Sequence, residues 1–203
     1  VMAQLKGEPM IARTVRTFQN CDAIFEIVIV TREDLILPIS GLCKDMPKVK
    51  AVVAGGKSRQ ESVHLGLNAL SKDMKLAAIH DGARPLITWQ LIDRVVRAAN
   101  THNAAAPAIP VKDTIKVVEG RVVKYTPDRA TLFAVQTPQV FDFDLLRGAL
   151  KKAELEGAQV TDDCSAVELM GMSVKIVDGD ERNLKVTTPM ELKIAETLLE
   201  EMQ

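Results

Sequence analysis

The stretch Ala78-Ile79-His80-Asp81-Gly82-Ala83-Arg84-Pro85 joins an apolar run to an aspartate and, three residues later, an arginine. The apolar part predicts a buried strand at residues 76–80. Ligands of open α/β sheets bind at the carboxyl ends of strands, where a carboxylate can hold Mg²⁺ against a triphosphate. Asp81 and Arg84 are therefore candidate site residues, although a turn-stabilising Asp81 and a surface Arg84 remain the alternative. His80, between apolar neighbours, is expected in or near the core rather than as a base.

The same alternation of short apolar runs and amphipathic stretches continues on both sides of this segment. Further strands are predicted at residues 26–31, 49–54, 105–110 and 174–177, and helices at residues 9–20, 59–71, 88–102 and 143–156. A last helix is expected to begin at Thr188, because Thr188 as N-cap, Pro189 and Glu191 are start signals that agree. This order favours an α/β, Rossmann-like fold with a mostly parallel sheet flanked by helices.

One segment interrupts the alternation and predicts a β-hairpin. Residues 114–118 and 121–125 alternate in polarity around Glu119-Gly120, a sequence typical of a hairpin turn. A two-stranded ribbon has little core of its own, so this arm, residues 111–129, must pack on another surface. The same arm of a second subunit and the sheet of its own chain are both open on pattern alone.

Composition favours a single-domain protein, residues 1–203, that acts on small molecules. The formal charge is −1 and aromatic residues make up 3% of the chain, which argues against nucleic acid as a partner. No apolar run is long enough to cross a membrane, and residues 1–4 carry no secretory signal, so we expect a cytoplasmic protein. The widely spaced Cys21, Cys43 and Cys164 predict reduced thiols rather than a disulfide framework or a zinc site.

Five further segments carry polar side chains at places where a ligand can bind. Gly55 and Gly56 lead from a strand into a helix that contains Ser62, an arrangement in which backbone amides can approach a ligand. Thr114 and Arg129 flank the arm, so folding of the hairpin would bring them together to hold a phosphate. The others are Gln136-Thr137-Pro138-Gln139, whose amides and hydroxyl suit a polyol, Thr161-Asp162-Asp163 and Asn183-Leu184-Lys185-Val186-Thr187. Taken singly, each is explained equally well by turns, caps or solvent exposure.

Taken in order, these segments resemble the methylerythritol phosphate cytidylyltransferases. The resemblance rests on Ala54-Gly55-Gly56 with Arg59 and Ser62, His80-Asp81-Gly82-Ala83-Arg84-Pro85, Val111-Lys112-Asp113-Thr114, Asp128-Arg129 and the three motifs just given, and it spans nearly the whole chain. It implies a nucleotidyltransferase that moves a cytidylyl group from CTP to 2-C-methyl-D-erythritol 4-phosphate with Mg²⁺ and releases pyrophosphate. It also implies a homodimer in which the arm of one subunit completes the active site of the other.

The resemblance assigns roles to particular residues. The nucleotide-binding residues would be Gly55, Gly56, Ser62, Asp81 and Gly82, with Gly56 and Ser62 at the cytosine and Asp81 beside the ribose, the phosphates and the metal. The methylerythritol phosphate would lie among Arg84, Thr114, Arg129, Thr137 and Lys185, with Thr114 and Arg129 from the partner subunit. Arg129 and Lys185 would position the attacking phosphate and are the candidate catalytic residues.

Members of this family begin with an apolar strand and a Gly-rich loop that carries an Arg and a Lys for the triphosphate. The sequence starts at Val1, and Met2-Ala3-Gln4-Leu5-Lys6-Gly7-Glu8-Pro9 resembles the stretch that follows this loop, so we expect a truncated chain or a further upstream segment. Two alternatives follow. A ribitol 5-phosphate cytidylyltransferase shares much of the nucleotide half, and a non-catalytic nucleotide-binding protein would lack the loop altogether.

Overall fold

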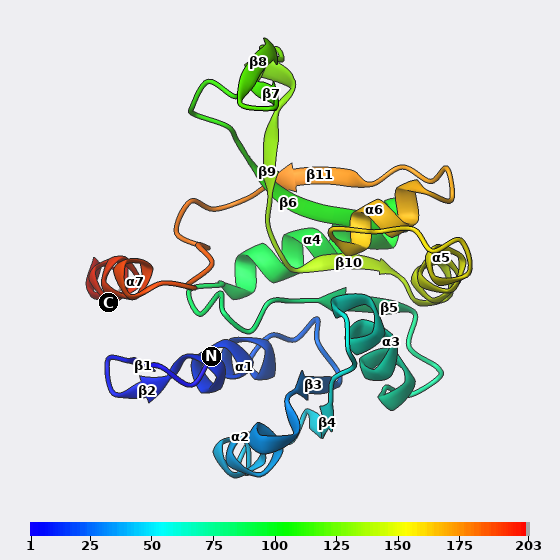
Figure 1. Ribbon diagram of the computed structural model, residues 1–203. Coiled ribbons are helices and arrows are strands. Elements are labelled where there is room, and N and C mark those ends of the chain that lie inside the picture. Colours follow the sequence, from blue (N-terminus) through cyan, green and yellow to red (C-terminus); the bar gives the residue numbers. More distant parts are fainter. Residues whose placement is uncertain (202–203) are drawn as a thin grey trace.

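A five-stranded sheet lies at the centre of the molecule. The computed structural model describes residues 1–201 (Figure 1). The strands of this sheet are β5 (Leu76–Ile79), β6 (Ala104–Pro110), β9 (Phe133–Val135), β10 (Gln139–Asp142) and β11 (Lys175–Asp178). They pair in the order β11-β6-β10-β5, and β9 pairs with β6 beyond that path. The α/β class expected from the sequence is confirmed.

The sheet is mixed rather than mostly parallel. β11 runs parallel to β6, but β10 is antiparallel to both of its neighbours, β5 and β6, and β9 is antiparallel to β6. The reason is the path of the chain, which leaves β6, turns through the arm and returns through β9 and β10 in the opposite direction. The sequence analysis expected neither β9 nor β10, since both are short and flank Pro138, which cannot donate a ladder hydrogen bond.

Helices cover both faces of this sheet, so β5, β6 and the middle of β10 are apolar on both sides rather than alternating. One face packs against α4 (Trp89–His102) and the end of α1 (Met10–Gln19) through a core that includes Phe18, Val95, Ala105 and Val140. The other packs against α3 (Arg59–Ala69), α5 (Phe143–Leu155) and α6 (Asp163–Glu168) through Leu67, Ala104, Phe141 and Leu146. Along β6, Ala104 and Ala105 point into opposite cores, as the two-residue repeat of a strand requires.

A second, two-stranded parallel sheet lies beside the first. Its strands are β3 (Ile27–Thr31) and β4 (Val49–Ala54), and α2 (Ile36–Leu42) packs on them through Ile29, Ile39 and Met46. The remaining short elements are β1 (Gln4–Leu5), β2 (Glu8–Pro9) and the 3-10 turns η1 (Glu33–Leu35) and η2 (Arg129–Thr131). In the described part of the chain, β3 pairs with β4 and β5 pairs with β10, and no ladder joins β3 to β5.

Most strands and helices expected from the sequence lie within two residues of their predicted bounds. The last helix, α7 (Pro189–Glu201), begins as expected, because the Thr188 hydroxyl accepts the Glu191 N–H at 3.2 Å and the Glu191 carboxylate accepts the Thr188 N–H at 2.8 Å. This reciprocal pair of hydrogen bonds is a capping box. The helices α2 and α6 were not expected.

The hairpin arm is present and extends away from both sheets (Figure 1). Its strands, β7 (Val117–Glu119) and β8 (Val122–Tyr125), pair with each other within residues 1–201. The turn is Gly120-Arg121, with φ of 55° and 66°, rather than the predicted Glu119-Gly120. Two central residues with positive φ give the turn a twist that matches the strands. Val118, Val122, Val123 and Tyr125 are exposed apolar side chains on this arm.

Candidate active site

Four predicted site residues meet where β5 ends. The Asp81 carboxylate lies 3.1 Å from the ammonium group of Lys185 and 3.5 Å from Nε of Arg84. The backbone N–H of Asp81 donates to the hydroxyl of Thr137 at 3.1 Å. The structure therefore brings an acid, two cations and a hydroxyl to the carboxyl end of a central strand.

The loop before α7 is fastened to this turn by several hydrogen bonds. Arg84 Nη1 donates to the carbonyl of Asn183 at 2.7 Å, and the N–H of Val186 donates to the carbonyl of Ala83 at 2.7 Å. The Asn183 amide, itself 1% exposed, donates to the carbonyl of Thr137 at 2.9 Å. Lys185 is thereby held against Asp81, although 104 residues of sequence separate them.

Electrostatics favour an anionic ligand at this cluster. Burial raises the pKa of Asp81, but the hydrogen bond and charge of Lys185, with Arg84, outweigh burial and hold that pKa below its ordinary value. Asp81 is therefore ionised near neutral pH. Nε of Arg84 is buried and has no hydrogen-bond partner in the described chain, although the Arg84 side chain is 12% exposed. The nearest acid to this Nε is Asp81, at 3.5 Å. One carboxylate thus faces two cations, so a phosphate or carboxylate oxygen beside them would be favoured.

The two glycines after β4 form a tight turn into α3. The N–H of Gly56 donates to the hydroxyl of Ser62 at 3.1 Å, and a Cβ placed on Gly56 would lie 2.2 Å from Cγ of Glu61. The Glu61 carboxylate in turn accepts the N–H of Lys57 at 2.6 Å. Close packing thus accounts for Gly56 by itself, while the turn still presents backbone groups at the helix N-terminus, where anions and acceptor groups bind.

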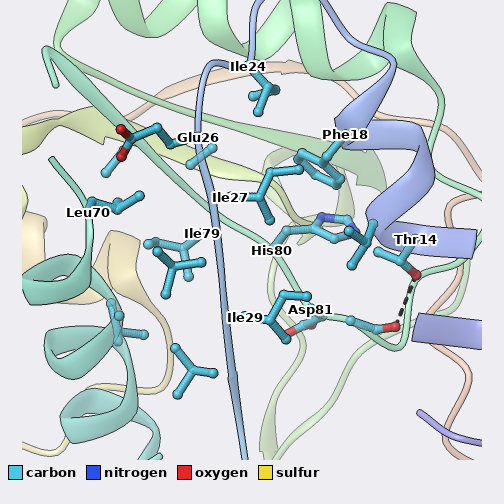
Figure 2. A pocket seen from close by; sticks show the side chains of 18 of the residues that line it. Thr14, Phe18, Ile24, Glu26, Ile27, Ile29, Leu70, Ile79, His80 and Asp81 are labelled. Atoms are coloured by element: carbon cyan, nitrogen blue, oxygen red, sulfur yellow. Dashed lines mark hydrogen bonds between the residues drawn. The ribbon is translucent and has the colours of Figure 1, made fainter. Parts of the chain in front are cut away.

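A cavity of about 1010 Å³ extends from the first turns of α3, at Arg59 and Ser62, to Asp81 and Gly82 at the end of β5. Figure 2 shows apolar side chains lining it, among them Ile27, Ile29 and Ile79, with Asp81 toward one end. Arg59, Ser62 and Gly82 also line it. The cavity lies between β3 and β5, whose facing edges are unpaired in the described chain. Unpaired strand edges and apolar walls suit this space to an extended apolar segment, whereas its Asp81 end suits a charged ligand.

The two arm residues lie apart from this cluster. Thr114 and Arg129 are exposed, and Arg129 Nη1 donates to the carbonyl of Lys112 at 2.8 Å across the base of the arm. The two ends of the arm are therefore joined, as the sequence predicts. Within residues 1–201, no hydrogen bond or ion pair links Thr114 or Arg129 to Asp81, Arg84 or Lys185.

The amides of the segment 136–139 are engaged inside the protein rather than free for a polyol. Gln136, 5% exposed, donates to the carbonyl of Asp180 at 2.8 Å and accepts its N–H at 3.2 Å. Gln139, 2% exposed, donates to the Asp162 carboxylate at 2.8 Å and accepts the N–H groups of Asp163 and Cys164. Thr137 is 5% exposed. The predicted polyol contact from these amides is not supported, because each has its partners within the chain.

The acids of the segment 161–163 organise α6 and bind Arg59. Asp162 caps α6 by accepting the N–H of Ser165 at 2.9 Å. Asp163, whose side chain is 1% exposed, accepts a hydrogen bond from Arg59 Nη2 at 2.5 Å. Burial raises the pKa of Asp163 although Arg59 opposes that change. The sequence analysis did not foresee this pair, and no local signal predicts it because the partners are 104 residues apart.

Comparison with known proteins identifies the family. The family model described as "IspD: 2-C-methyl-D-erythritol 4-phosphate cytidylyltransferase" matches residues 1–201. The chain belongs to this family. Enzymes of that name from Symbiobacterium thermophilum and Halalkalibacterium halodurans are each 46% identical to it, over 97% and 98% of the chain and 83% and 88% of their own lengths. It is thus related to enzymes that match it almost from end to end.

Solved structures of IspD proteins share the fold. The 4-diphosphocytidyl-2C-methyl-D-erythritol synthase of Anaerococcus prevotii superposes with a TM-score of 0.92 at 30% identity, covering 97% of this chain and 88% of that one. The Thermus thermophilus cytidylyltransferase gives 0.84 at 32%, covering 98% and 93%. As an IspD protein, the chain is a cytidylyltransferase of isoprenoid precursor synthesis that uses CTP. These relatives carry the methylerythritol name, which favours that substrate over ribitol phosphate and an enzyme over a non-catalytic binding protein.

Asp81 is the candidate metal ligand of this site. Residues 1–201 contain no group of three or more His, Cys, Asp or Glu side chains arranged to hold a metal ion. Mg²⁺ often uses one or two carboxylates together with phosphate oxygens and water. The Asp81 carboxylate fits this pattern as one ligand beside bound phosphates.

None of the helices in residues 1–201 is long and apolar enough to cross a membrane.

Proposed function

We propose that the cluster of Asp81, Arg84 and Lys185 is where this IspD protein joins the methylerythritol phosphate to the α-phosphate of CTP. The observation that carries the proposal is the contact of one carboxylate with two cations, which leaves an excess of positive charge at the end of β5. Two polyanions repel each other, so their reaction requires fixed positive charge and correct positioning more than it requires a base. A phosphate monoester is already an anionic nucleophile.

Each side chain has a distinct task in this proposal. Arg84 and Lys185 hold the methylerythritol phosphate by charge-assisted hydrogen bonds, and Lys185 also directs its attacking oxygen. Asp81 and Gly82 lie beside the ribose and the phosphates, and Asp81 would bind Mg²⁺. Mg²⁺ would neutralise charge on the triphosphate and the leaving pyrophosphate. Gly55, Gly56 and Ser62 would lie at the cytosine, because Ser62 lines the same cavity as Asp81 and its hydroxyl accepts the N–H of Gly56.

The arm residues require a second subunit. Thr114 and Arg129 lie on the arm and have no hydrogen bond or ion pair with the Asp81 cluster in the described chain. The exposed Val118, Val122, Val123 and Tyr125 supply apolar surface for an interface. We therefore propose a homodimer in which the arm of each subunit brings Thr114 and Arg129 to the phosphate held by the other. The chain would act as one nucleotidyltransferase domain in the cytoplasm.

Pyrophosphate release tests the reaction. The protein, expressed from its complete coding sequence, is assayed with CTP and Mg²⁺ on 2-C-methyl-D-erythritol 4-phosphate and, separately, on ribitol 5-phosphate. Release with the first substrate and little with the second is expected. Release on ribitol 5-phosphate alone would replace the substrate, and release on neither would contradict the proposed function.

The assignment of the phosphate to Arg84 has its own test. Arg84→Ala removes a guanidinium of the cluster, whereas Arg97→Ala removes one that pairs only with Asp93 on the exposed side of α4. The first variant is expected to raise KM for methylerythritol phosphate and lower kcat/KM by roughly a hundredfold. The second is expected to match the unaltered enzyme. Equal kinetics for both variants would remove Arg84 from the phosphate site.

A further inference from the structure

Two side chains, His80 and Thr137, connect the two ends of the turn that carries Asp81 and Arg84. His80 Nε2 lies 3.4 Å from the carbonyl oxygen of Arg84, and His80 Nδ1 lies 3.0 Å from the hydroxyl of Thr137. That hydroxyl accepts the backbone N–H of Asp81 at 3.1 Å. A chain of three contacts therefore runs from residue 84 through both side chains to residue 81.

For a neutral imidazole, one placement of protons satisfies all three contacts. A backbone carbonyl can only accept and a backbone N–H can only donate, while a neutral imidazole has one N–H and threonine has one O–H. Nε2 of His80 must therefore carry the ring proton and donate it to the carbonyl of Arg84. The Thr137 hydroxyl must donate to the bare Nδ1. The opposite tautomer would set a lone pair of Nε2 against the carbonyl oxygen.

Other contacts hold the same turn and the same ring. The ring of Phe18 lies 4.8 Å from that of His80, which fixes the imidazole from the side of α1 (Figure 2). The Thr14 hydroxyl lies 3.1 Å from the carbonyl oxygen of Gly82 and 3.0 Å from that of Met10, and its one proton is shared between these two acceptors. The N–H of Arg84 donates to the carbonyl of Asp81 at 3.0 Å. The backbone of residues 81–84 is thus tied at each end and in the middle.

We propose that His80 and Thr137 are a pair of positioning residues that hold this turn so that Asp81 and Arg84 face Lys185. In this arrangement Thr137 acts on the substrate through the turn, since the single proton of its buried hydroxyl is donated to His80. This inference rests on the proposed function of the Asp81 cluster. It departs from the expectation that Thr137 binds the methylerythritol phosphate directly.

The first test reads the proton on His80 without measuring activity. Long-range ¹H–¹⁵N correlation spectra of the ¹⁵N-labelled protein are expected to show His80 with a protonated Nε2 and a bare Nδ1. Thr137→Val, which keeps the shape but removes the hydroxyl, is expected to shift the Nδ1 resonance, and Thr137→Ser to restore it. A proton on Nδ1 in the unaltered protein, or an Nδ1 resonance indifferent to Thr137→Val, would overturn the inference.

The second test separates positioning from direct binding. His80→Phe keeps an aromatic ring against Phe18 but removes both nitrogens, and folding of each variant is checked by its melting temperature. His80→Phe and Thr137→Val are each expected to lower kcat/KM roughly tenfold, with the double variant no worse than either alone and Thr137→Ser recovering most of the loss. A raised KM in Thr137→Val that His80→Phe does not share would overturn the inference. So would losses of kcat/KM that multiply in the double variant. If the unaltered protein transferred no cytidylyl group, the proposed function would fail while the spectra still tested the pairing.

Discussion

Asp81 owes its low pKa to two cations that the sequence places 3 and 104 residues away. Lys185 and Arg84 outweigh the effect of burial, so the carboxylate is charged, and the two cations carry more positive charge than this one carboxylate balances. His80 precedes this turn, and its lowered pKa has the opposite effect on charge, because a lowered pKa favours the uncharged form of an imidazole. Burial lowers its pKa to about 4, so it is uncharged near neutral pH, in agreement with the expectation of a core histidine rather than a base.

Loss of either candidate catalytic cation is expected to slow turnover strongly without unfolding the protein. Arg129 is exposed and the Lys185 side chain is 49% exposed, so neither supports a core. Arg129→Ala and Lys185→Ala should each lower kcat by roughly a hundredfold, or about 3 kcal/mol of transition-state stabilisation. Lys193→Ala, on the exposed face of α7, is the matched control. Rates near those of the control would remove the residue from the mechanism.

The ion pair of Arg59 with Asp163 is expected to contribute to stability as well as to the site. Arg59→Ala leaves the carboxylate of Asp163 buried and uncompensated, whereas Arg97→Ala only exposes a surface acid. Breaking a fully buried pair costs about 3–5 kcal/mol, and the partial exposure of Arg59 reduces this to about 2 kcal/mol. Urea unfolding measures the difference. A loss as small as that of Arg97→Ala would show that Asp163 is stabilised without Arg59.

At the scale of the elements, caps determine where helices begin. The α7 capping box satisfies N–H groups that no helical partner can reach, with Glu191 accepting from both Thr187 and Thr188. The side chain of Asp162 does the same for α6. These signals act over three or four residues. The sequence could therefore predict the start of α7. Short apolar runs, which are also local, predicted the strands β3 to β6 to within two residues.

The Glu191 cap is expected to make stability depend on pH. Its hydrogen bonds to Thr187 and Thr188 lower the pKa of Glu191 from 4.5 to about 2. A lowered pKa stabilises the folded state above pH 4.5, and that contribution is lost as pH falls from 4.5 toward 2. The gap in melting temperature between the unaltered protein and Glu191→Gln should be constant above pH 6 and close below 4.5.

The control for this cap is Glu154→Gln, an exposed position on α5 whose side chain makes no hydrogen bond within residues 1–201. Its melting temperature should follow that of the unaltered protein at each pH. A gap for Glu191→Gln that widened on acidification would contradict the assigned role of the cap.

At the scale of the whole molecule, the arm separates residues that the proposed reaction needs together. Arg129 lies on the arm and Lys185 on the body, so a dimer that exchanges arms would build each site from two chains. The path of the chain is compatible with this exchange, because the arm lies between β6 and β9 in the sequence and extends away from the sheet (Figure 1). Its exposed valines and tyrosine would be costly in a monomer.

Co-expression of two inactive variants tests the shared site. Arg129→Ala and Lys185→Ala subunits that pair at random form half heterodimers, and one of the two sites in each has both residues intact. About a quarter of normal activity should return. The control pair is Arg84→Ala with Lys185→Ala, two variants on the body that leave Arg129 intact. This pair would recover about a quarter of the activity only if Arg84 and Lys185 of one chain served different sites. Because both belong to the same body cluster, no recovery is expected from this control pair.

The outcome of that experiment discriminates the two oligomeric arrangements. Recovery with the arm and body variants but not with the control pair supports exchange of arms. Absence of recovery in both would mean that Arg129 and Lys185 act within one chain, and the homodimer proposal would lose its functional basis.

Features that depend on neighbours along the chain could be predicted from the sequence. The strand that delivers Asp81 and Arg84, the capping box at Thr188, the hairpin and the ordered motifs of the family were all readable, because propensities, caps and turns act over a few residues. Tertiary structure alone decided the antiparallel insertion of β10, the internal use of Gln136 and Gln139, and the contact of His80 with Thr137. These features depend on which distant segments pack together, because packing decides which polar side chains come within hydrogen-bonding distance of each other.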